Sequence, residues 1–183
     1  ILRECLRYEQ LVERLLPQLP PPPLRDHSDA AVTPPQEIFR VFGYCESARF
    51  DVASDAFATL RELLTRQRPL VARFLSAYHD DFFARYHRLV RADNYVTRRK
   101  SLRLLGDVLL DRSHFSTMTR YIASADNLEI VMRALLDPSV AIQLEAFHVF
   151  KVFVANPRKQ PRVLAVLLRN QHALLNFLRH FQP

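Results

Sequence analysis

The stretch LEAFHVFKVFVANP (residues 144–157) determines how the rest of the sequence is interpreted. Its polar residues Glu145, His148 and Lys151 are three positions apart, whereas a half-buried strand would alternate every two. The apolar residues at helical spacing, which form one broad face, are Ala146, Val149, Phe150, Phe153 and Val154. Since most of the remaining surface is also apolar, the stretch predicts a helix that is buried on most sides, with a narrow polar stripe.

Two further copies of this pattern precede it at intervals of 45 residues. One shift leads to KSLRLLGDVLL (100–110) and a second to DAFATLRELLT (55–65). The small residues Ala56, Ser101 and Ala146 align, and bulky apolar residues follow them in register. A helix buried on most sides fits a stack of repeats, because neighbours cover it from both directions. The period lies within the roughly 40–47 residues of armadillo and HEAT repeats, so we predict an all-α, armadillo/HEAT-like, right-handed helical-repeat solenoid with a period of about 45 residues.

The composition agrees with a folded helical protein. Hydrophobic residues make up 49% of the sequence and charged residues 25%, which is typical of a globular chain. Only two glycines occur, which disfavours an all-β fold with many tight turns. No apolar run reaches the length of about 18 residues that crosses a bilayer, so no membrane association is predicted.

Prolines and aspartates indicate where helices begin. Pro69 and Pro138 are interpreted as first-turn residues, because the fixed φ angle of proline suits that position. Asp93, Asp126 and Asp137 each precede a helical pattern and are predicted to cap it.

The chain divides into three parts by composition. Residues 1–16 read as the end of a preceding helical repeat, since LRECLRYEQ looks like the middle of a helix, so the chain is expected to be a fragment. Residues 17–36, PQLPPPPLRDHSDAAVTPPQ, are predicted to be a proline-rich loop with polyproline character. A plain surface linker is favoured over a ligand for a proline-recognising domain. Residues 37–183 form the helical-repeat domain.

Recognisable catalytic and metal-binding motifs are missing. The sequence holds no glycine-rich phosphate loop, HExxH, CxxC or GxSxG. His79 and His87 are two helical turns apart, and a solvated helix surface is favoured over a metal site. Cys5 and Cys45 lack zinc or redox spacing, which favours a reducing, cytoplasmic location. We therefore predict no catalytic residue, metal or cofactor, and a binding surface instead of an enzyme.

The basic residues suggest where a partner binds. The formal net charge is +7, and the densest basic patch is NYVTRRKSLR (94–103), with Arg112 and Phe115 beyond it. Arginines beside an aromatic ring suit a protein-binding hot spot, but a solvated cationic face plus a core phenylalanine fits the spacing equally well. The alternative function is a basic helical-repeat module that binds nucleic acid, although few aromatics accompany the patch for base stacking.

At these residues the sequence resembles a known family. The segments that carry the resemblance are FDVASDAFATLRELLTR (50–66), DNYVTRRKSLRLLGDVLLDRSHF (93–115) and LEAFHVFKVFVANP (144–157). They are similar to the mouse protein 25 family, also called calcium-binding protein 39, and the similarity extends over residues 37–182 and 1–9. The family consists of helical-repeat scaffolds, so the resemblance implies a scaffold without catalytic activity. Despite the family's second name, no EF-hand loop is visible.

The resemblance also implies partners and a first binding surface. Members of the family hold the STRAD pseudokinase in a closed conformation, help to activate the liver kinase B, and activate germinal-centre kinases. Matching residues imply a concave kinase-facing surface that includes Tyr95, Arg99, Arg103, Arg112 and Phe115. Arg103 stands where other members have lysine, which keeps the charge.

A second implied site is a pocket for the Trp-Glu-Phe tail of the pseudokinase. Met132 matches a pocket residue, and Arg169 and Asn170 are implied to line the same site. Ordinary core packing is the alternative for Met132. Glu129 departs from the family pattern, where a basic residue is common, and this predicts a weaker attraction for an acidic tail.

Overall fold

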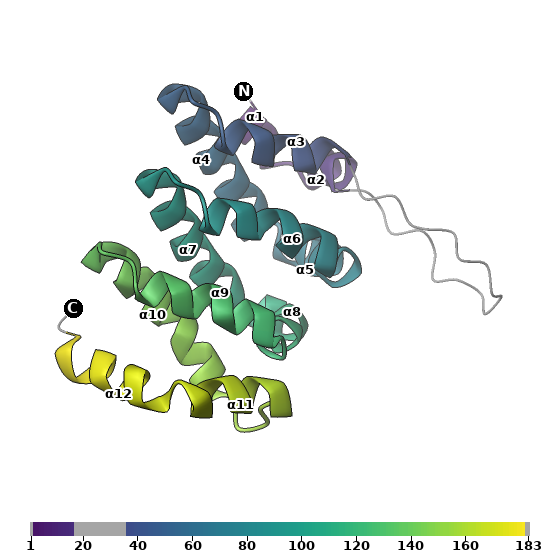
Figure 1. The fold of residues 1–183 in the computed structure, drawn as a ribbon. Helices are drawn as coiled ribbons and strands as arrows, with labels where there is room; N and C mark the ends of the chain where they lie inside the picture. The colour runs from purple at the N-terminus through teal and green to yellow at the C-terminus, as the bar shows by residue number, and fades with distance from the viewer. Residues whose placement is uncertain (1, 17–35, 182–183) are drawn as a thin grey trace. The chain divides into compact units, whose positions relative to one another are not determined.

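The fold is described by a computed structural model that covers residues 2–16 and 36–181 (Figure 1). All regular elements in these ranges are helices, and none is long and apolar enough to cross a membrane. In chain order they are α1 (Leu2–Cys5), α2 (Glu9–Leu15), α3 (Gln36–Cys45), α4 (Phe50–Arg66), α5 (Arg68–Ala77), α6 (His79–Val90), α7 (Tyr95–Leu110), the 3₁₀ helix η1 (Arg112–His114), α8 (Phe115–Ile122), α9 (Ala125–Leu135), α10 (Val140–Ala155), α11 (Pro161–Arg169) and α12 (Gln171–His180).

The helices repeat in groups of three along the chain. Helices α4, α7 and α10 begin at Phe50, Tyr95 and Val140, each 45 residues after the last. Helices α6, α9 and α12 begin 46 residues apart, and α5, α8 and α11 precede them. The predicted fold class is therefore confirmed: the chain is an all-α, armadillo/HEAT-like helical-repeat solenoid.

Burial follows the predicted register in two of the three copies. In α4 the buried aligned residues are Ala56, Phe57, Leu60, Leu63 and Leu64. In α7 they are Ser101, Leu102, Leu105, Val108 and Leu109. In α10 the equivalents Ala146, Phe150 and Phe153 are buried, but Phe147 is half-buried and the side chain of Val154 is 47% exposed. The helix α10 buries one face and half-buries the residues beside it, and His148 and Lys151 of the predicted polar stripe are exposed, but the exposed stripe also includes Val154 and is wider than predicted. A run of apolar residues does not reveal which of them the fold covers.

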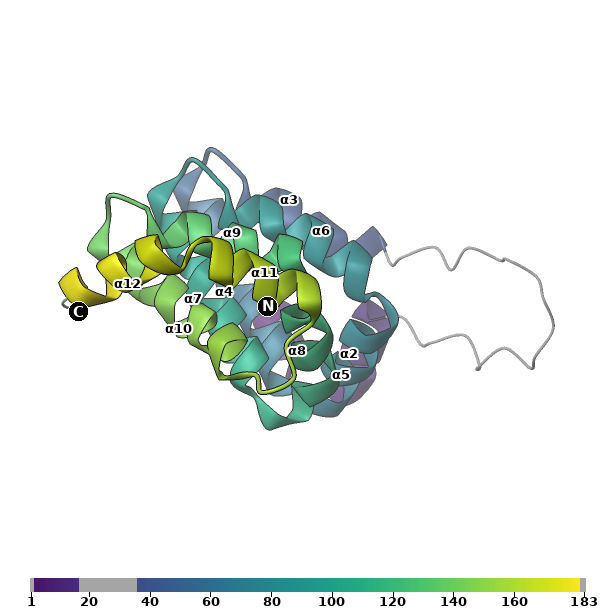
Figure 2. The same ribbon diagram turned by 60° about the horizontal axis from the view of Figure 1, so that its bottom comes forward.

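The described chain divides into two compact units at Thr117, and each is considered by itself. In the first unit, α4 packs beside α7 and α3 beside α6, as both views show (Figures 1 and 2). Its core holds a cluster of aromatic rings in which Phe82 makes edge-to-face contacts with Phe42 and Phe74, at centroid distances of 5.6 and 6.0 Å. Tyr86 stacks on Phe82 and donates a 2.8 Å hydrogen bond to the carbonyl of Ser101, which ties α6 to α7.

In the second unit, α9 packs against both α10 and α11. Tyr121 is fully buried and meets Phe153 edge to face at 5.9 Å. The Asn127 side chain donates a 2.9 Å hydrogen bond to the carbonyl of Tyr121, so the turn between α8 and α9 is fixed from within. The pocket described below is built on the outer residues of α9.

For two of the three predicted helix caps, the residue that caps the helix is a neighbour one or two positions away from the predicted aspartate. Asn94, not Asp93, caps α7, and its side chain accepts hydrogen bonds from the backbone N–H groups of residues 96 and 97 at 2.9 and 3.1 Å. Ser124 caps α9, whereas Asp126 lies inside its first turn. Both predictions are wrong because several neighbouring side chains can cap a helix, and the sequence alone does not rank them.

The third predicted cap, Asp137, precedes α10 by three residues. Its carboxylate accepts a 2.9 Å hydrogen bond from the backbone N–H of Ser139, and Ser139 occupies the N-cap position. Pro138 lies before that cap and not in the first turn, so its predicted position is wrong. Pro69 lies in the first turn of α5, as predicted.

The amino-terminal segment is not one helix. LRECLRYEQ is interrupted between α1 and α2, and Tyr8 has an extended backbone at the start of α2. The predicted loop 17–36 lies outside the described residues, apart from Gln36, which begins α3. The division into residues 1–16, 17–36 and 37–183 stays a prediction.

The two histidines of α6 are buried, so their assignment to a solvated surface is wrong. The ring of His79 lies 4.7 Å from that of Phe83, and the ring of His87 lies 6.1 Å from it. Burial is the main cause that lowers the pKa of His87 to about 4, with smaller contributions from the nearby Arg91 and His79. His87 is thus a neutral core residue at physiological pH.

Candidate partner-binding sites

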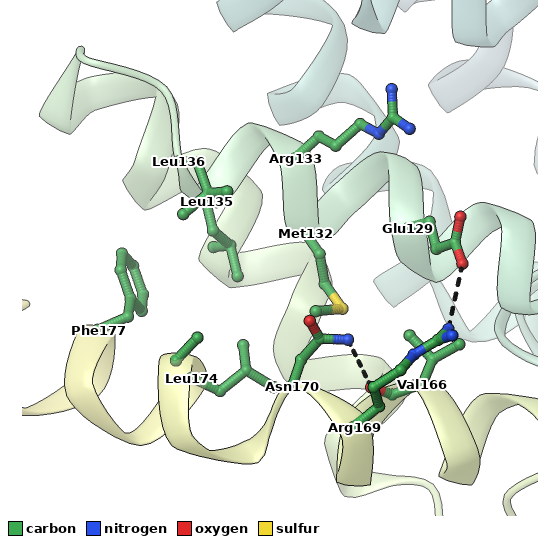
Figure 3. A pocket seen from close by; sticks show the side chains of 11 residues that line it. Glu129, Met132, Arg133, Leu135, Leu136, Val166, Arg169, Asn170, Leu174 and Phe177 are labelled. Atoms are coloured by element: carbon green, nitrogen blue, oxygen red, sulfur yellow. Dashed lines mark hydrogen bonds and ion pairs between the residues drawn. The ribbon is translucent and has the colours of Figure 1, made fainter.

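A pocket opens between α9, α11 and α12 in the second unit. Its volume is about 320 Å³, and most of the side chains around it are apolar. The lining residues are Glu129, Met132, Arg133, Leu135, Leu136, Val166, Arg169, Asn170, Ala173, Leu174 and Phe177 (Figure 3). Apolar pockets with a few polar groups at the edge are the usual form of a ligand site.

The three residues implied for a tail pocket lie together here. The thioether of Met132 points from α9 towards the corner between α11 and α12, while Arg169 and Asn170 lie at the end of α11 (Figure 3). Met132 is half-buried and borders the open pocket, so ordinary core packing does not describe its position. The role of the three residues as a peptide site stays a prediction.

Asn170 holds the corner between α11 and α12. Its side-chain amide donates a 2.8 Å hydrogen bond to the carbonyl of Val166, and its backbone N–H bonds the same carbonyl at 3.2 Å. Both bonds go to one carbonyl group in the last turn of α11, where carbonyl groups often lack partners. Asn170 therefore shapes the pocket by positioning α12 after α11.

Charged residues lie at the edge of the pocket. A guanidinium nitrogen of Arg169 lies 4.0 Å from a carboxylate oxygen of Glu129, and both side chains are largely exposed. Such a pair contributes little free energy because water screens it. Arg133 makes no ion pair with any residue in the described part of the chain. The edge therefore offers one guanidinium without a carboxylate partner and one that is loosely paired.

The residues implied for a kinase-facing surface fall into two sets. Tyr95, Arg99 and Arg103 are exposed and follow one another at four-residue spacing on α7, so they form one row. Arg112 and Phe115 are also exposed, but they come after the end of α7, on η1 and the first turn of α8. The ring of Phe115 is 67% exposed, which excludes the interpretation of this residue as core.

Sequence reasoning missed an exposed aromatic residue in the same unit. Phe50 begins α4 as Tyr95 begins α7, and the two are 68% and 42% exposed. The sequence carries a signal for this pair, because a shift of 45 residues aligns Phe50 with Tyr95. The aligned apolar register begins at Ala56, inside the helix, and does not include the residues that begin α4 and α7.

The described residues show no arrangement typical of catalysis. They contain no group of three His, Cys, Asp or Glu side chains that could hold a metal ion. Neither Cys5 nor Cys45 forms a disulfide. Burial, aided by the Glu46 carboxylate and opposed by Lys100, raises the pKa of the Cys45 thiol to about 12, so this thiol stays protonated near neutral pH.

Fold and pocket together define a helical-repeat protein of the armadillo/HEAT class with an apolar pocket at a helix corner. A profile of the Mo25-like family matches residues 1–183. The chain belongs to the Mo25-like family.

Three relatives from distant organisms show the extent of the match. The chain is 46% identical to a calcium-binding protein 39-like protein of Mus musculus and 44% identical to a Mo25-like protein of Schizosaccharomyces pombe. These alignments cover 100% and 99% of this chain but only 49% and 50% of the relatives. A degreening-related protein of Auxenochlorella protothecoides is 52% identical over 72% of this chain and 41% of its own length. The chain thus spans about half the length of the curated relatives it matches.

Proposed function

We propose that this chain belongs to a non-catalytic scaffold that binds and activates protein kinases or a STRAD-like pseudokinase. The candidate kinases are those related to the liver kinase B and the germinal-centre kinases. The α9–α11–α12 pocket holds a carboxy-terminal Trp-Glu-Phe motif, and the surface around Tyr95, Arg99, Arg103, Arg112 and Phe115 contacts the kinase fold. The observation that carries the proposal is that Met132, Arg169 and Asn170 border one apolar pocket with cations at its edge.

The chemistry of the pocket suits such a peptide. A polarisable thioether makes favourable contacts with an aromatic ring, which fits Met132 against the indole. The glutamate and the terminal carboxylate need cationic partners, and Arg133 and Arg169 stand at the edge of the pocket. The loose Arg169–Glu129 pair separates when a ligand carboxylate takes its place, because the pair is exposed and weak.

Activation follows if the scaffold binds the active form of the kinase fold more tightly than the inactive form. A near-complete shift between the two forms needs about 5 kcal/mol of differential binding. A single exposed row of side chains does not provide this amount. A tail held in a separate pocket raises the effective concentration of the kinase fold at the second surface, whereas the preference for the active form comes from all the contacts of that surface, on α7, η1 and α8 together.

A binding experiment tests the pocket. A dye-labelled peptide that ends in Trp-Glu-Phe is titrated with the protein, and its fluorescence anisotropy reports the dissociation constant. We expect Met132→Ala and Arg169→Ala each to weaken binding by about tenfold, because the first removes a contact with the indole and the second removes a cation that pairs with a carboxylate of the peptide. Arg162→Ala is the matched control, because Arg162 is an exposed arginine of α11 outside the pocket. Equal affinities for all four proteins would refute the assignment.

An activation experiment tests the second surface. The full-length protein is mixed with its kinase partner, and kinase activity is measured with Arg99→Ala and Phe115→Ala scaffolds. Both variants are expected to lower activation while peptide binding to the pocket stays normal. Arg73→Ala, an exposed arginine of α5, serves as the control. Full activation by both surface variants would exclude the proposed role of these residues.

A further inference from the structure

Two cavities lie along the contact between α4 and α7, and together we call them the α4–α7 groove. The cavities have volumes of about 180 and 390 Å³ and share Ser54, Phe57 and Lys100 in their walls, so they adjoin. The smaller one lies at the first turns of both helices and includes Phe50 and Val96. The larger one extends along the helices towards their middle.

The groove is preformed by contacts between the two helices. The Lys100 ammonium donates a 3.1 Å hydrogen bond to the Ser54 hydroxyl. The Arg61 guanidinium reaches the Asp107 carboxylate at 3.8 Å, two helical turns further along. Phe57 and Leu104 are buried beneath these polar side chains and form an apolar floor. A segment that enters the groove therefore meets side chains held in place from both helices.

The charges in the larger cavity are unevenly paired. Lys100 and Arg103 both line it, and neither makes an ion pair with a residue that the structure describes. The nearby carboxylates already have cationic partners: Asp55 has Arg3 at 2.5 Å, Glu62 has Arg66 at 2.8 Å, and Asp107 has Arg61 at 3.8 Å. Two cations that face one cavity are thus left without compensation.

We propose that the α4–α7 groove binds a phosphorylated serine or threonine within an extended segment of a partner protein. A phosphomonoester carries a charge of about −1.5 to −2 near pH 7 and has three acceptor oxygens. Lys100 and Arg103 balance this charge, and the Ser54 hydroxyl donates to a third oxygen. An apolar side chain of the same segment occupies the smaller cavity, against Phe50 and Val96.

The same features favour a phosphopeptide over other anions. A single carboxylate has half the charge of a phosphate dianion and leaves one of the two cations uncompensated. A nucleic-acid strand carries a phosphate at every nucleotide, and the two uncompensated cations of the larger cavity, Lys100 and Arg103, are too few to balance such a continuous line of charge. An isolated phosphate beside an apolar anchor matches the groove.

The inference rests on the proposed function in one respect, since Arg103 belongs both to the α4–α7 groove and to the proposed kinase-facing surface. It adds the class of ligand that this part of the surface recognises. The pocket for the Trp-Glu-Phe tail is formed by other residues, so the failure of one site is measured separately from the failure of the other.

The test compares three dye-labelled peptide mixtures. Their central residue is phosphothreonine, threonine or glutamate, and all other positions are degenerate. Fluorescence anisotropy is measured with the whole chain at moderate salt. We expect the phosphothreonine mixture to bind about tenfold more tightly than the threonine mixture, with glutamate in between, because charge-assisted bonds to the phosphate are added. Equal binding of all three mixtures would overturn the proposal.

Substitutions locate the site. Lys100→Gln with Arg103→Gln is expected to abolish the preference for phosphate, while the Trp-Glu-Phe peptide still binds. Arg73→Gln on α5 changes the net charge without touching the groove and is expected to keep the preference. If the double variant unfolds, as seen by circular dichroism, Arg103→Gln alone is used, since exposed substitutions rarely affect stability.

Two results would contradict the assignment. An equal loss of phosphopeptide binding in the Arg73→Gln variant would show general attraction between opposite charges. Competition by a single-stranded RNA oligonucleotide at the same phosphate concentration would show binding of polyanions without a specific site. A loss confined to the groove variants supports the site even if the Trp-Glu-Phe peptide does not bind at all.

Discussion

Helices α6 and α12 occupy the same place in the repeat but use their apolar residues differently. The buried residues of α6 are His79, Phe82, Phe83, Tyr86, His87, Leu89 and Val90. None of the residues of α12 is buried, and Leu174 and Phe177 border the pocket instead. The same apolar pattern thus completes a core in α6, whereas in α12 two of its residues line an open pocket.

The largest expected effect contrasts α7 with α10 at one position of the repeat. Leu109 is buried and Val154, its equivalent, is 47% exposed. Leu109→Ala is expected to lower the free energy of unfolding by about 2–5 kcal/mol, because it leaves a cavity. Val154→Ala is expected to change it by less than about 0.5 kcal/mol, as at most surface sites. Urea unfolding followed by circular dichroism measures both. Similar losses would mean that Val154 is covered in solution.

The next effect separates the core histidine of α6 from a surface histidine. The pKa of His87 is about 4 in the folded chain and near 6.5 when exposed, so the unfolded chain binds more protons between these values. Stability is therefore expected to fall as the pH drops from 7 to 4, with His87 responsible for about 2–3 kcal/mol of the loss. His87→Phe should remove this part of the pH dependence, whereas substitution of the exposed His148 by Phe should not. Parallel stability–pH curves for His87→Phe and the unmodified protein would exclude this role.

A smaller effect concerns how the helices begin. Asn94→Ala removes a side chain that accepts two backbone hydrogen bonds at the start of α7, and we expect a loss of about 1 kcal/mol. Asp93→Ala is the matched control, because the neighbouring aspartate makes no cap. Thermal unfolding compares the two variants with the unmodified chain. A larger loss for Asp93→Ala would mean that the aspartate is the true cap.

These comparisons show how far the sequence predicts the molecule. The spacing of apolar residues predicts the repeat, since the same side-chain periodicity must recur wherever a helix enters the stack. It does not predict that Val154 is exposed or that His87 is buried, because both depend on which neighbours the folded chain supplies. Caps fail for a related reason, as Asp93 and Asn94 are equally suitable in the sequence.

The candidate sites were predictable to different degrees. Only a resemblance points to Met132, because its position beside Arg169 requires α9 and α11 to pack together, and no local sequence pattern specifies that contact. The α4–α7 groove was not foreseen, although Lys100 and Arg103 lie in the basic patch. The net charge of the groove depends on which of its charged side chains are already paired, and the pair Arg61–Asp107 joins two helices that are far apart in the sequence.

The smallest expected effect concerns the edge of the pocket, where the charged side chains of Glu129 and Arg169 lie near the exposed apolar helix α12. Glu129 lies 4.0 Å from Arg169 and would face the carboxylates of a Trp-Glu-Phe peptide. Glu129→Gln removes a repelling charge and releases Arg169, so peptide binding should strengthen by about two- to fivefold, equivalent to about 0.5–1 kcal/mol. Asp126→Asn, a charge change on the same helix outside the pocket, should leave the affinity unchanged. Because the contribution is electrostatic, the gain should shrink as salt is raised. A gain that is equal in both variants would indicate that only net charge matters, and weaker binding by Glu129→Gln would mean that Glu129 itself contacts the peptide.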